Sequence, residues 1–158
     1  MQNIKIEKMT VDDIDKIYKL ELEIFKDDPW PVEWFHEGLS DYEGHYFIAY
    51  LDDEIAGYCG MYHISSSLPN YCQISKLAVL QQFRRRGIGK ILMLKMLDKA
   101  RELGLNSAML EVNTKNDALE FYKLLGFEIK EFKENYYKKS GDDAYIMWHN
   151  CLSDLIRS

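Results

Sequence analysis

The chain has 158 residues, of which 47% are hydrophobic and 13% aromatic, and its formal net charge at pH 7 is −6. This length is near the commonest domain size, and the apolar share is large enough for a buried core. We therefore expect one domain over residues 1–158 and exclude intrinsic disorder. The net acidity argues against general nucleic-acid binding, which usually needs a broad basic face.

The cysteines argue against a disulfide framework or a zinc site. Cys59, Cys72 and Cys151 are odd in number, widely spaced and form no C-x-x-C pair, a pattern typical of thiols in a reducing compartment. The first residues lack the apolar region of a signal peptide, and no apolar run reaches membrane-spanning length. We expect a soluble, cytoplasmic protein that needs no metal and does not bind a membrane.

The first half of the chain predicts a strand, two helices and a β-hairpin. A strand over residues 1–6 precedes Thr10-Val11-Asp12-Asp13, which has the spacing of a capping box and opens a helix. Asp28-Pro29-Trp30-Pro31 breaks this helix and starts a short second one toward Gly38. Residues 46–51 and 55–64 alternate in polarity around Asp52-Asp53 and therefore predict a hairpin.

The second half predicts strands that alternate with helices. A buried strand over residues 74–80 is followed by a helix over 88–103 that ends at Gly104, a residue suited to a left-handed cap. A strand over 107–113 precedes a helix that Thr114-Lys115-Asn116-Asp117 opens and Gly126 closes. Strands over 127–132 and 144–148 complete a mixed sheet with helices on its faces, an α/β (α+β) architecture.

The most informative segment is Arg84-Arg85-Arg86-Gly87-Ile88-Gly89, at the mouth of the helix over 88–103. The first-turn N–H groups of a helix have no intrahelical partner, and the positive end of the helix dipole lies there. Glycine lets a phosphate approach the backbone closely. The spacing is neither that of a P-loop nor that of a Rossmann fingerprint. This local basic spot on an acidic chain predicts a site for a small phosphorylated ligand, and a basic helix start without a ligand is the alternative.

Two carboxylates lie among apolar residues. Glu111 interrupts the apolar run of residues 108–112, where desolvation raises the pKa of a carboxyl toward the range useful for a base; an ion pair with a lysine is the alternative. Glu21 shares helical spacing with the apolar residues at 14, 17, 18, 24 and 25. An ion pair with a lysine and the binding of a substrate ammonium are equally good interpretations of Glu21.

Four motifs in order resemble those of the GNAT superfamily of N-acetyltransferases. R-x-x-G-x-G after Leu77-Ala78-Val79 resembles its acetyl-CoA signature, and Glu111-Val112-Asn113 followed by Asn116, Tyr122 and Leu125-Gly126-Phe127 resembles its next strand–helix–strand. Phe25 with Pro29-Trp30, and Asn135-Tyr136-Tyr137 with residues 143–147, resemble a narrower branch. That branch comprises the ribosomal-protein-alanine and archaeal N-α-acetyltransferases.

The resemblance implies the acyl-CoA N-acyltransferase fold of that superfamily, a mostly antiparallel sheet of roughly six or seven strands with about four helices. It also implies that the backbone of Leu77-Ala78-Val79 aligns the pantetheine arm of acetyl-CoA and that the basic turn receives the pyrophosphate. The cofactor-binding residues would be Leu77, Ala78, Val79, Arg84, Arg85, Arg86, Gly87, Ile88, Gly89, Lys90 and Asn116. Asn116 is one residue closer to Tyr122 than in that branch, so either Lys115 contacts the cofactor or the helix starts differently.

The resemblance further implies direct acetyl transfer to a primary amine, with Glu111 as general base and Tyr122 as the acid that protonates the departing thiolate. Core packing is the alternative interpretation of Tyr122. Contacts with the amine substrate are expected from Glu21, Phe25, Trp30, Tyr136 and Tyr137. For the aromatic residues among them, ordinary core and loop packing is the alternative.

An α-amino group has a pKa of about 8 and a lysine one of about 10.4, so a protein N-terminus needs less help from a base. We therefore expect the acceptor to be the N-terminal amine of a protein or peptide. Polyamines, aminoglycosides and lysine side chains are alternatives. A non-catalytic acyl-CoA sensor would keep the basic turn without needing Glu111 and Tyr122. We expect a monomer or homodimer that binds no nucleic acid.

Overall fold

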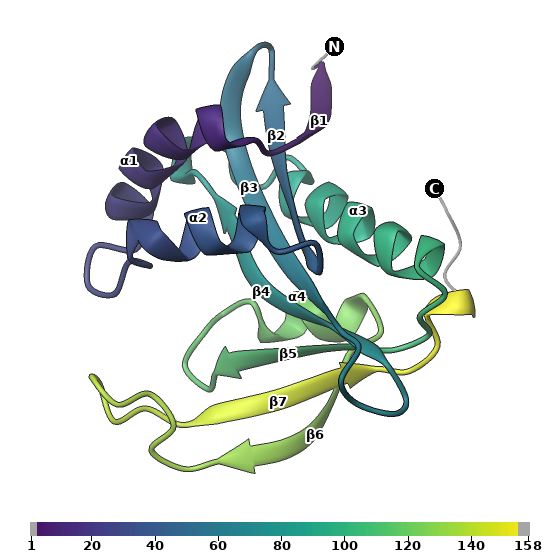
Figure 1. Ribbon diagram of the computed structural model, residues 1–158. Helices are drawn as coiled ribbons and strands as arrows, with labels where there is room; N and C mark the ends of the chain where they lie inside the picture. Colours follow the sequence, from purple (N-terminus) through teal and green to yellow (C-terminus); the bar gives the residue numbers. More distant parts are fainter. Residues whose placement is uncertain (1–2, 155–158) are drawn as a thin grey trace. The chain divides into compact units, whose positions relative to one another are not determined.

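The computed structural model describes residues 3–154 (Figure 1), so residues 1 and 2 of the predicted first strand lie outside the described part. The elements of the described part are β1 (Ile4–Lys8), α1 (Ile14–Ile24), α2 (Val32–Ser40), β2 (Gly44–Leu51), β3 (Glu54–Ile64), β4 (Tyr71–Val79), α3 (Ile88–Glu102), β5 (Ala108–Asn113), α4 (Leu119–Leu124), β6 (Glu128–Lys133) and β7 (Ala144–His149). Their order along the chain is the predicted one.

The seven strands form one mixed sheet in the order β1-β2-β3-β4-β5-β7-β6. β4 and β5 are parallel, from Cys72 opposite Ala108 to Ile74 opposite Leu110. The pairs β1–β2, β2–β3, β5–β7 and β6–β7 are antiparallel. The predicted fold class, a mostly antiparallel mixed sheet with four helices, is therefore confirmed.

Contacts group the described residues into two compact units. The first comprises the residues up to Tyr62 together with Lys76–Asp98, and the second comprises His63–Ser75 together with the residues from Lys99 onward. The boundary falls within β3, within β4 and within α3. The expectation of one domain over residues 1–158 stays a prediction.

In the first unit, α1 and α2 lie on one face of the β2–β3 hairpin and α3 lies on the other (Figure 1). This layering follows from strand alternation, because successive side chains point to opposite faces. Tyr46 and Ile48 share a buried core with Phe35 of α2. Phe47, between them, lies beneath α3, where Lys95 Nζ is 5.4 Å from its ring centroid.

Local signals in the first unit behave as predicted. Thr10 and Asp13 form the capping box, in which the Thr10 N–H donates to Asp13 Oδ2 at 2.8 Å. Residues 11–13 form a short 3-10 turn before α1 begins at Ile14. Asp52 and Asp53 both have positive φ, 49° and 71°, as a two-residue hairpin turn of type I′ requires.

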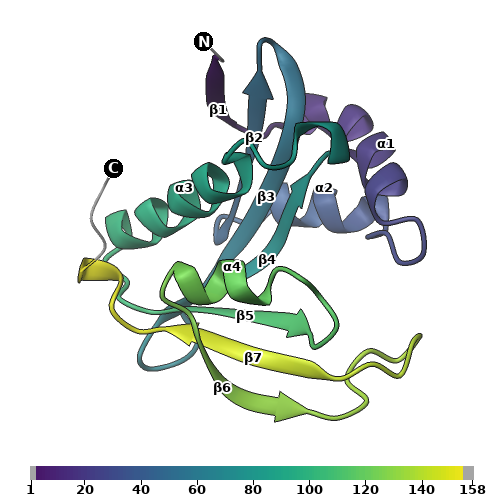
Figure 2. The same cartoon turned by 180° about the vertical axis from the view of Figure 1, so that it is seen from behind.

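In the second unit, α4 lies against the face of β5 and β7 that is turned to the viewer in Figure 2. Phe127, which is fully buried, links this helix to β7. Its ring centroid lies 6.3 Å from that of Tyr122 in α4 and 5.6 Å from that of His149 in β7. Every residue of β6 is exposed, as expected of an edge strand rich in charged side chains.

The predicted start of α4 is wrong. The helix begins at Leu119, after a turn in which Asn113 Oδ1 accepts from the Lys115 N–H and Asn116 Oδ1 accepts from the Ala118 N–H, at 2.9 and 2.8 Å. Asparagine side chains compete with the helix for backbone donors, which explains the late start. The predicted glycine caps after α3 and α4 are confirmed, because Gly104 and Gly126 both have positive φ. Within residues 3–154, no helix has the length and apolar character needed to cross a membrane.

Candidate functional site

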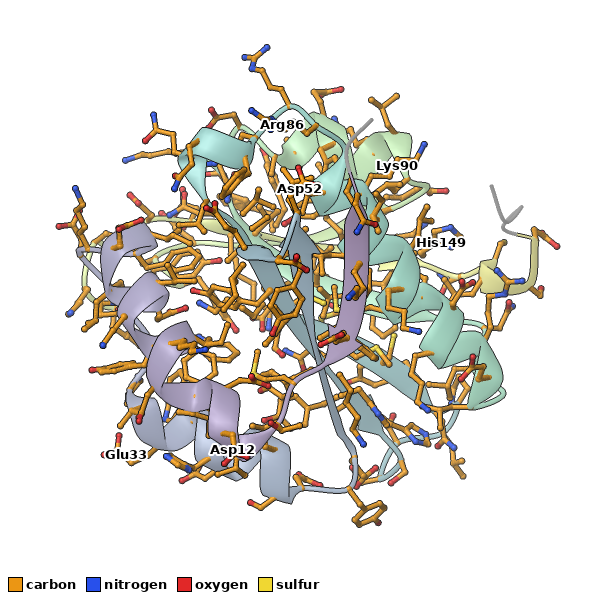
Figure 3. The ribbon with its side chains drawn as sticks, turned by 90° about the horizontal axis from the view of Figure 1, so that it is seen from above. Asp12, Glu33, Asp52, Arg86, Lys90 and His149 are labelled. Carbon is orange, nitrogen blue, oxygen red and sulfur yellow. The ribbon has the colours of Figure 1, made fainter. Side chains whose placement is uncertain are left out.

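The arginine–glycine turn, residues 84–89, leads into the N-terminal end of α3 in the first unit. The Ile91 N–H donates to the Gly87 carbonyl at 3.0 Å, so the N–H groups of residues 88–90 precede the first intrahelical bond. Arg84, Arg85 and Arg86 are exposed. Figure 3 shows Arg86 and Lys90 at the same end of α3. Backbone donors, the helix dipole and cationic side chains therefore meet at one exposed turn.

The backbone of this turn is open to a ligand. Gly87 has a φ of 78°, and a Cβ added there would meet nothing within 4 Å. Arg85 also has a positive φ, 63°, which is uncommon for a residue other than glycine and costs free energy. A helix N-terminus with exposed arginines suits a diphosphate, whose oxygens accept charge-assisted hydrogen bonds.

The end of β4 presents backbone groups beside this turn. The Leu80 N–H donates to the Ala56 carbonyl of β3 at 2.9 Å. Because backbone groups alternate in direction along a strand, those of Leu77 and Val79 point away from β3 and those of Ala78 point toward it. The Val79 carbonyl also accepts from Arg84 Nε at 3.2 Å. These directions support the predicted alignment of a ligand arm by Leu77 and Val79.

Glu111 lies at the middle of β5 in the second unit and is half-buried. Its Oε1 accepts from Gln73 Nε2 at 3.1 Å, and its Oε2 accepts from the Tyr136 hydroxyl. Burial raises the pKa of Glu111, and the charge of Lys133 opposes this increase. A carboxylate with neutral hydrogen-bond partners and a raised pKa has the properties of a general base.

Tyr136 and Tyr137 lie by this carboxylate, and Tyr122 lies within electrostatic range of Tyr137. Burial raises the pKa of Tyr122, whose phenol is protonated at neutral pH even at its ordinary pKa of about 10. The pKa of Tyr137 is raised to about 12, first by burial and then by the charges of Glu111 and Tyr122, so Tyr137 lies within electrostatic range of both. The rings of Tyr136 and Tyr137 pack edge to face, with centroids 5.3 Å apart. The second unit therefore brings together four predicted site residues.

Asn116 and Lys115 already have partners within the second unit. Lys115 Nζ forms an ion pair with Asp142 Oδ1 at 2.8 Å, and Asn116 caps the turn before α4. The late start of α4 agrees with the alternative that this helix starts differently. A contact of either side chain with the cofactor stays a prediction.

Glu21 is fully buried, with 0% exposure, in the first unit. Its Oε1 accepts from the Tyr58 hydroxyl at 2.8 Å, and its Oε2 accepts from both the Trp30 N–H and Lys76 Nζ at 2.8 Å. Of the two interpretations of Glu21, the ion pair with a lysine is the one found. Because three donors already occupy the buried carboxylate, a substrate ammonium reaches it only by displacing one of them.

The sequence analysis missed Lys76, Tyr58 and Gln73. Lys76 is 8% exposed, and its Nζ lies 3.9 Å from the Phe25 ring centroid and 4.3 Å from that of Trp30. The available signal was the position of Lys76 on the buried row of β4, which also contains Cys72, Ile74 and Ala78. Tyr58 and Gln73 gave no comparable signal, because a tyrosine or glutamine in a strand is unremarkable.

Comparisons with known proteins agree with these features. Residues 11–127 match the family model described as "Acetyltransferase (GNAT) family". The chain is 34% identical over 146 residues to N-alpha-acetyltransferase RimI of Mycobacterium tuberculosis, covering 91% of this chain and 90% of that protein. It is 32% identical over 154 residues to an N-alpha-acetyltransferase of Sulfurisphaera tokodaii, covering 90% of each.

Solved structures share the fold. The structure of Ard1 from Thermoplasma volcanium has a TM-score of 0.80 and 28% identity, covering 92% of this chain and 96% of that chain. The ribosomal-protein-S18-alanine N-acetyltransferase from Escherichia coli has a TM-score of 0.84 over 94% of each chain at 22% identity, which is a likeness of fold alone. The predicted resemblance and fold are thus confirmed, and the chain belongs to the acetyltransferase (GNAT) family.

Proposed function

We propose that the protein transfers the acetyl group of acetyl-CoA to the N-terminal α-amino group of a protein or peptide. The observation that carries this proposal is the half-buried Glu111, which has a raised pKa and lies by Tyr136 and Tyr137. The relatives named N-alpha-acetyltransferases, which match over nine tenths of this chain, support the choice of acceptor.

The arginine–glycine turn binds the pyrophosphate of acetyl-CoA in this proposal. The open space at Gly87, the N–H groups ahead of the Ile91 bond and the exposed arginines fit such a group. Leu77 and Val79 supply backbone groups to the pantetheine arm, with Ala78 between them. Acetyl-CoA brings the activated thioester, and the protein binds and orients it.

Glu111 acts as the general base and removes a proton from the acceptor ammonium. Burial raises its pKa toward that of an α-amino group, about 8, so proton transfer from the ammonium to Glu111 is less uphill than transfer to an ordinary carboxylate. The free amine then forms a bond to the acetyl carbon as the carbon–sulfur bond breaks. Tyr122, whose phenol is protonated at neutral pH, donates its proton to the departing thiolate and regains one from the nitrogen, which loses its second proton as the amide forms.

Phe25, Trp30, Tyr136 and Tyr137 contact the first residues of the acceptor in this proposal, and either Asn116 or Lys115 adds a cofactor contact. The acceptor pKa favours an N-terminus over a lysine or a polyamine, because a weaker base is needed to deprotonate it. A cytoplasmic location and a monomeric or homodimeric state also stay predictions.

The acceptor class is tested by measuring thiol release from acetyl-CoA with matched amines. One peptide carries a free N-terminus and an acetylated lysine, and a second of the same sequence carries a blocked N-terminus and a free lysine. Spermidine and an aminoglycoside complete the panel. We expect turnover with the first peptide only, and mass spectrometry should locate the acetyl group on its N-terminus. Turnover confined to spermidine or to the second peptide would contradict the proposal.

A further inference from the structure

A buried ion pair lies behind the segment that joins α1 to α2 in the first unit. This segment, Phe25–Trp30, is called the acceptor segment here, because Phe25 and Trp30 contact the acceptor in the proposed function. Lys76 and Glu21 are 8% and 0% exposed, and their charged atoms are 2.8 Å apart. Burying two charges is costly unless both are well paired, so the pair needs a reason beyond simple core packing.

The pair engages both ends of the acceptor segment. At one end, Lys76 Nζ lies 3.9 Å from the Phe25 ring centroid. At the other end, the same atom lies 4.3 Å from the Trp30 ring centroid, and the Trp30 N–H donates to Glu21 Oε2 at 2.8 Å. Cation–π contacts are strongest when the cation is desolvated, as this ammonium is.

Elements with regular structure hold the pair in place. Lys76 belongs to β4, Glu21 to α1, and Tyr58 of β3 donates to Glu21 Oε1 at 2.8 Å. Trp30 packs further on Phe35 of α2, with ring centroids 5.3 Å apart. The acceptor segment itself is the irregular part of this arrangement, since it joins the end of α1 to the start of α2. The strands and α1 therefore fix the positions of Lys76 and Glu21, and these two side chains in turn hold the acceptor segment.

We infer that Lys76 and Glu21 are positioning residues that hold Phe25 and Trp30 in the conformation that receives the acceptor. This inference rests on the proposed function for the identity of what is received. It assigns neither residue a contact with the substrate or with acetyl-CoA. Losing either charge frees the acceptor segment and weakens acceptor binding, while acetyl-CoA binding at the arginine–glycine turn is unaffected.

Three variants and one control test the inference. Lys76→Met keeps length and removes the cation, Glu21→Gln keeps shape and removes the anion, and the double variant leaves no unpaired buried charge. Lys19→Met, on the exposed side of α1, removes one positive charge without touching the pair. Circular dichroism first establishes that each variant is folded. The double variant keeps the test available if a single variant does not fold.

Hydrogen exchange is the first measurement, because it needs no acceptor. We expect faster exchange over residues 25–30, including the Trp30 amide, in all three variants and no change in Lys19→Met. The second measurement is of two KM values, one for the acceptor peptide and one for acetyl-CoA. We expect the acceptor-peptide KM to rise about tenfold in Lys76→Met and in Glu21→Gln. The acetyl-CoA KM should stay within about twofold of the wild-type value. The double variant should be no worse than either single one, because the two residues act as a unit.

The outcomes separate this inference from the proposed function. Unchanged exchange over residues 25–30 in both single variants would overturn it, even if the wild-type protein acetylates peptides. An equal rise in both KM values would also overturn it, since that indicates a general loss of structure. If the variants exchange faster over residues 25–30 but the wild-type protein acetylates no peptide, the positioning role of the ion pair would be supported and the proposed function overturned.

Discussion

The two carboxylates that interrupt apolar rows, Glu21 in α1 and Glu111 in β5, have opposite environments. Glu21 is fully buried and paired with the cation of Lys76. Glu111 is half-buried and accepts hydrogen bonds from two neutral side chains, and burial raises its pKa although the charge of Lys133 opposes this increase. The same anomaly in sequence therefore has two meanings, and the charge of the partner decides between them. The ion pair makes Glu21 part of the buried scaffold, whereas the hydrogen-bond partners of the half-buried Glu111 are neutral.

Replacement of Glu111 tests this contrast most strongly. Glu111→Gln keeps the shape and the Gln73 and Tyr136 neighbours but cannot accept a proton, so kcat should fall by about 10³-fold, within the usual range for a lost general base. Affinity for acetyl-CoA, measured by calorimetry, should not change. Glu131→Gln is a matched control, because Glu131 of β6 also pairs with Ile146 of β7 but is exposed. A near-normal kcat in Glu111→Gln would remove the assignment.

Replacement of Lys76 tests the other carboxylate through stability. Lys76→Met leaves Glu21 charged and buried with only two donors, which should lower the free energy of unfolding by about 3 kcal/mol. Urea denaturation at neutral pH measures this loss, with Lys19→Met expected to change stability by no more than about 0.5 kcal/mol. Equal stability of the two variants would show that the buried pair contributes little and that Glu21 is not fixed by Lys76.

The cofactor turn gives a third test, of intermediate size. Gly87→Trp should weaken acetyl-CoA binding by about 30-fold, equivalent to a lost helix-terminus contact of about 2 kcal/mol. Gly104→Trp is the control, because Gly104 has a similar φ of 82° and equally open surroundings but follows the C-terminal end of α3. Calorimetry that finds equal affinities for the two variants would contradict a pyrophosphate site at Gly87.

Features governed by neighbours along the chain could be predicted from the sequence. The capping box at Thr10, the Asp52-Asp53 turn and the Gly104 cap each depend on a few consecutive residues. The start of α4 could not, because Asn113 and Asn116 compete for backbone donors in a way that propensity does not capture. That error concerns neighbouring residues, whereas the contacts missed at the candidate site join residues that are far apart in the sequence.

Long-range partners explain what was missed at the site. The Lys76–Glu21 contact joins residues 55 apart in sequence, and the Gln73–Glu111 contact joins residues 38 apart. The predicted strand over residues 74–80 already contains Ile74, Lys76 and Ala78 of the buried row of β4, but it does not show which carboxylate lies opposite Lys76. The pattern of apolar residues along the chain identifies an anomalous carboxylate, but only the folded structure identifies its partner.

The pH dependence of the reaction gives the smallest and sharpest test of the contrast. A carboxylate base works only when deprotonated, so kcat/KM should fall as the pH drops through the raised pKa of Glu111. Tyr136→Phe removes a donor that stabilises the charged carboxylate, which should raise the pKa of Glu111 further and move the acid limb to higher pH. Tyr42→Phe, at an exposed position, should leave the profile unchanged. An acid limb that does not move in Tyr136→Phe would mean that a group other than Glu111 controls it. The assignment of Glu111 as the base would then fail, while the role of the Lys76–Glu21 pair would not be affected.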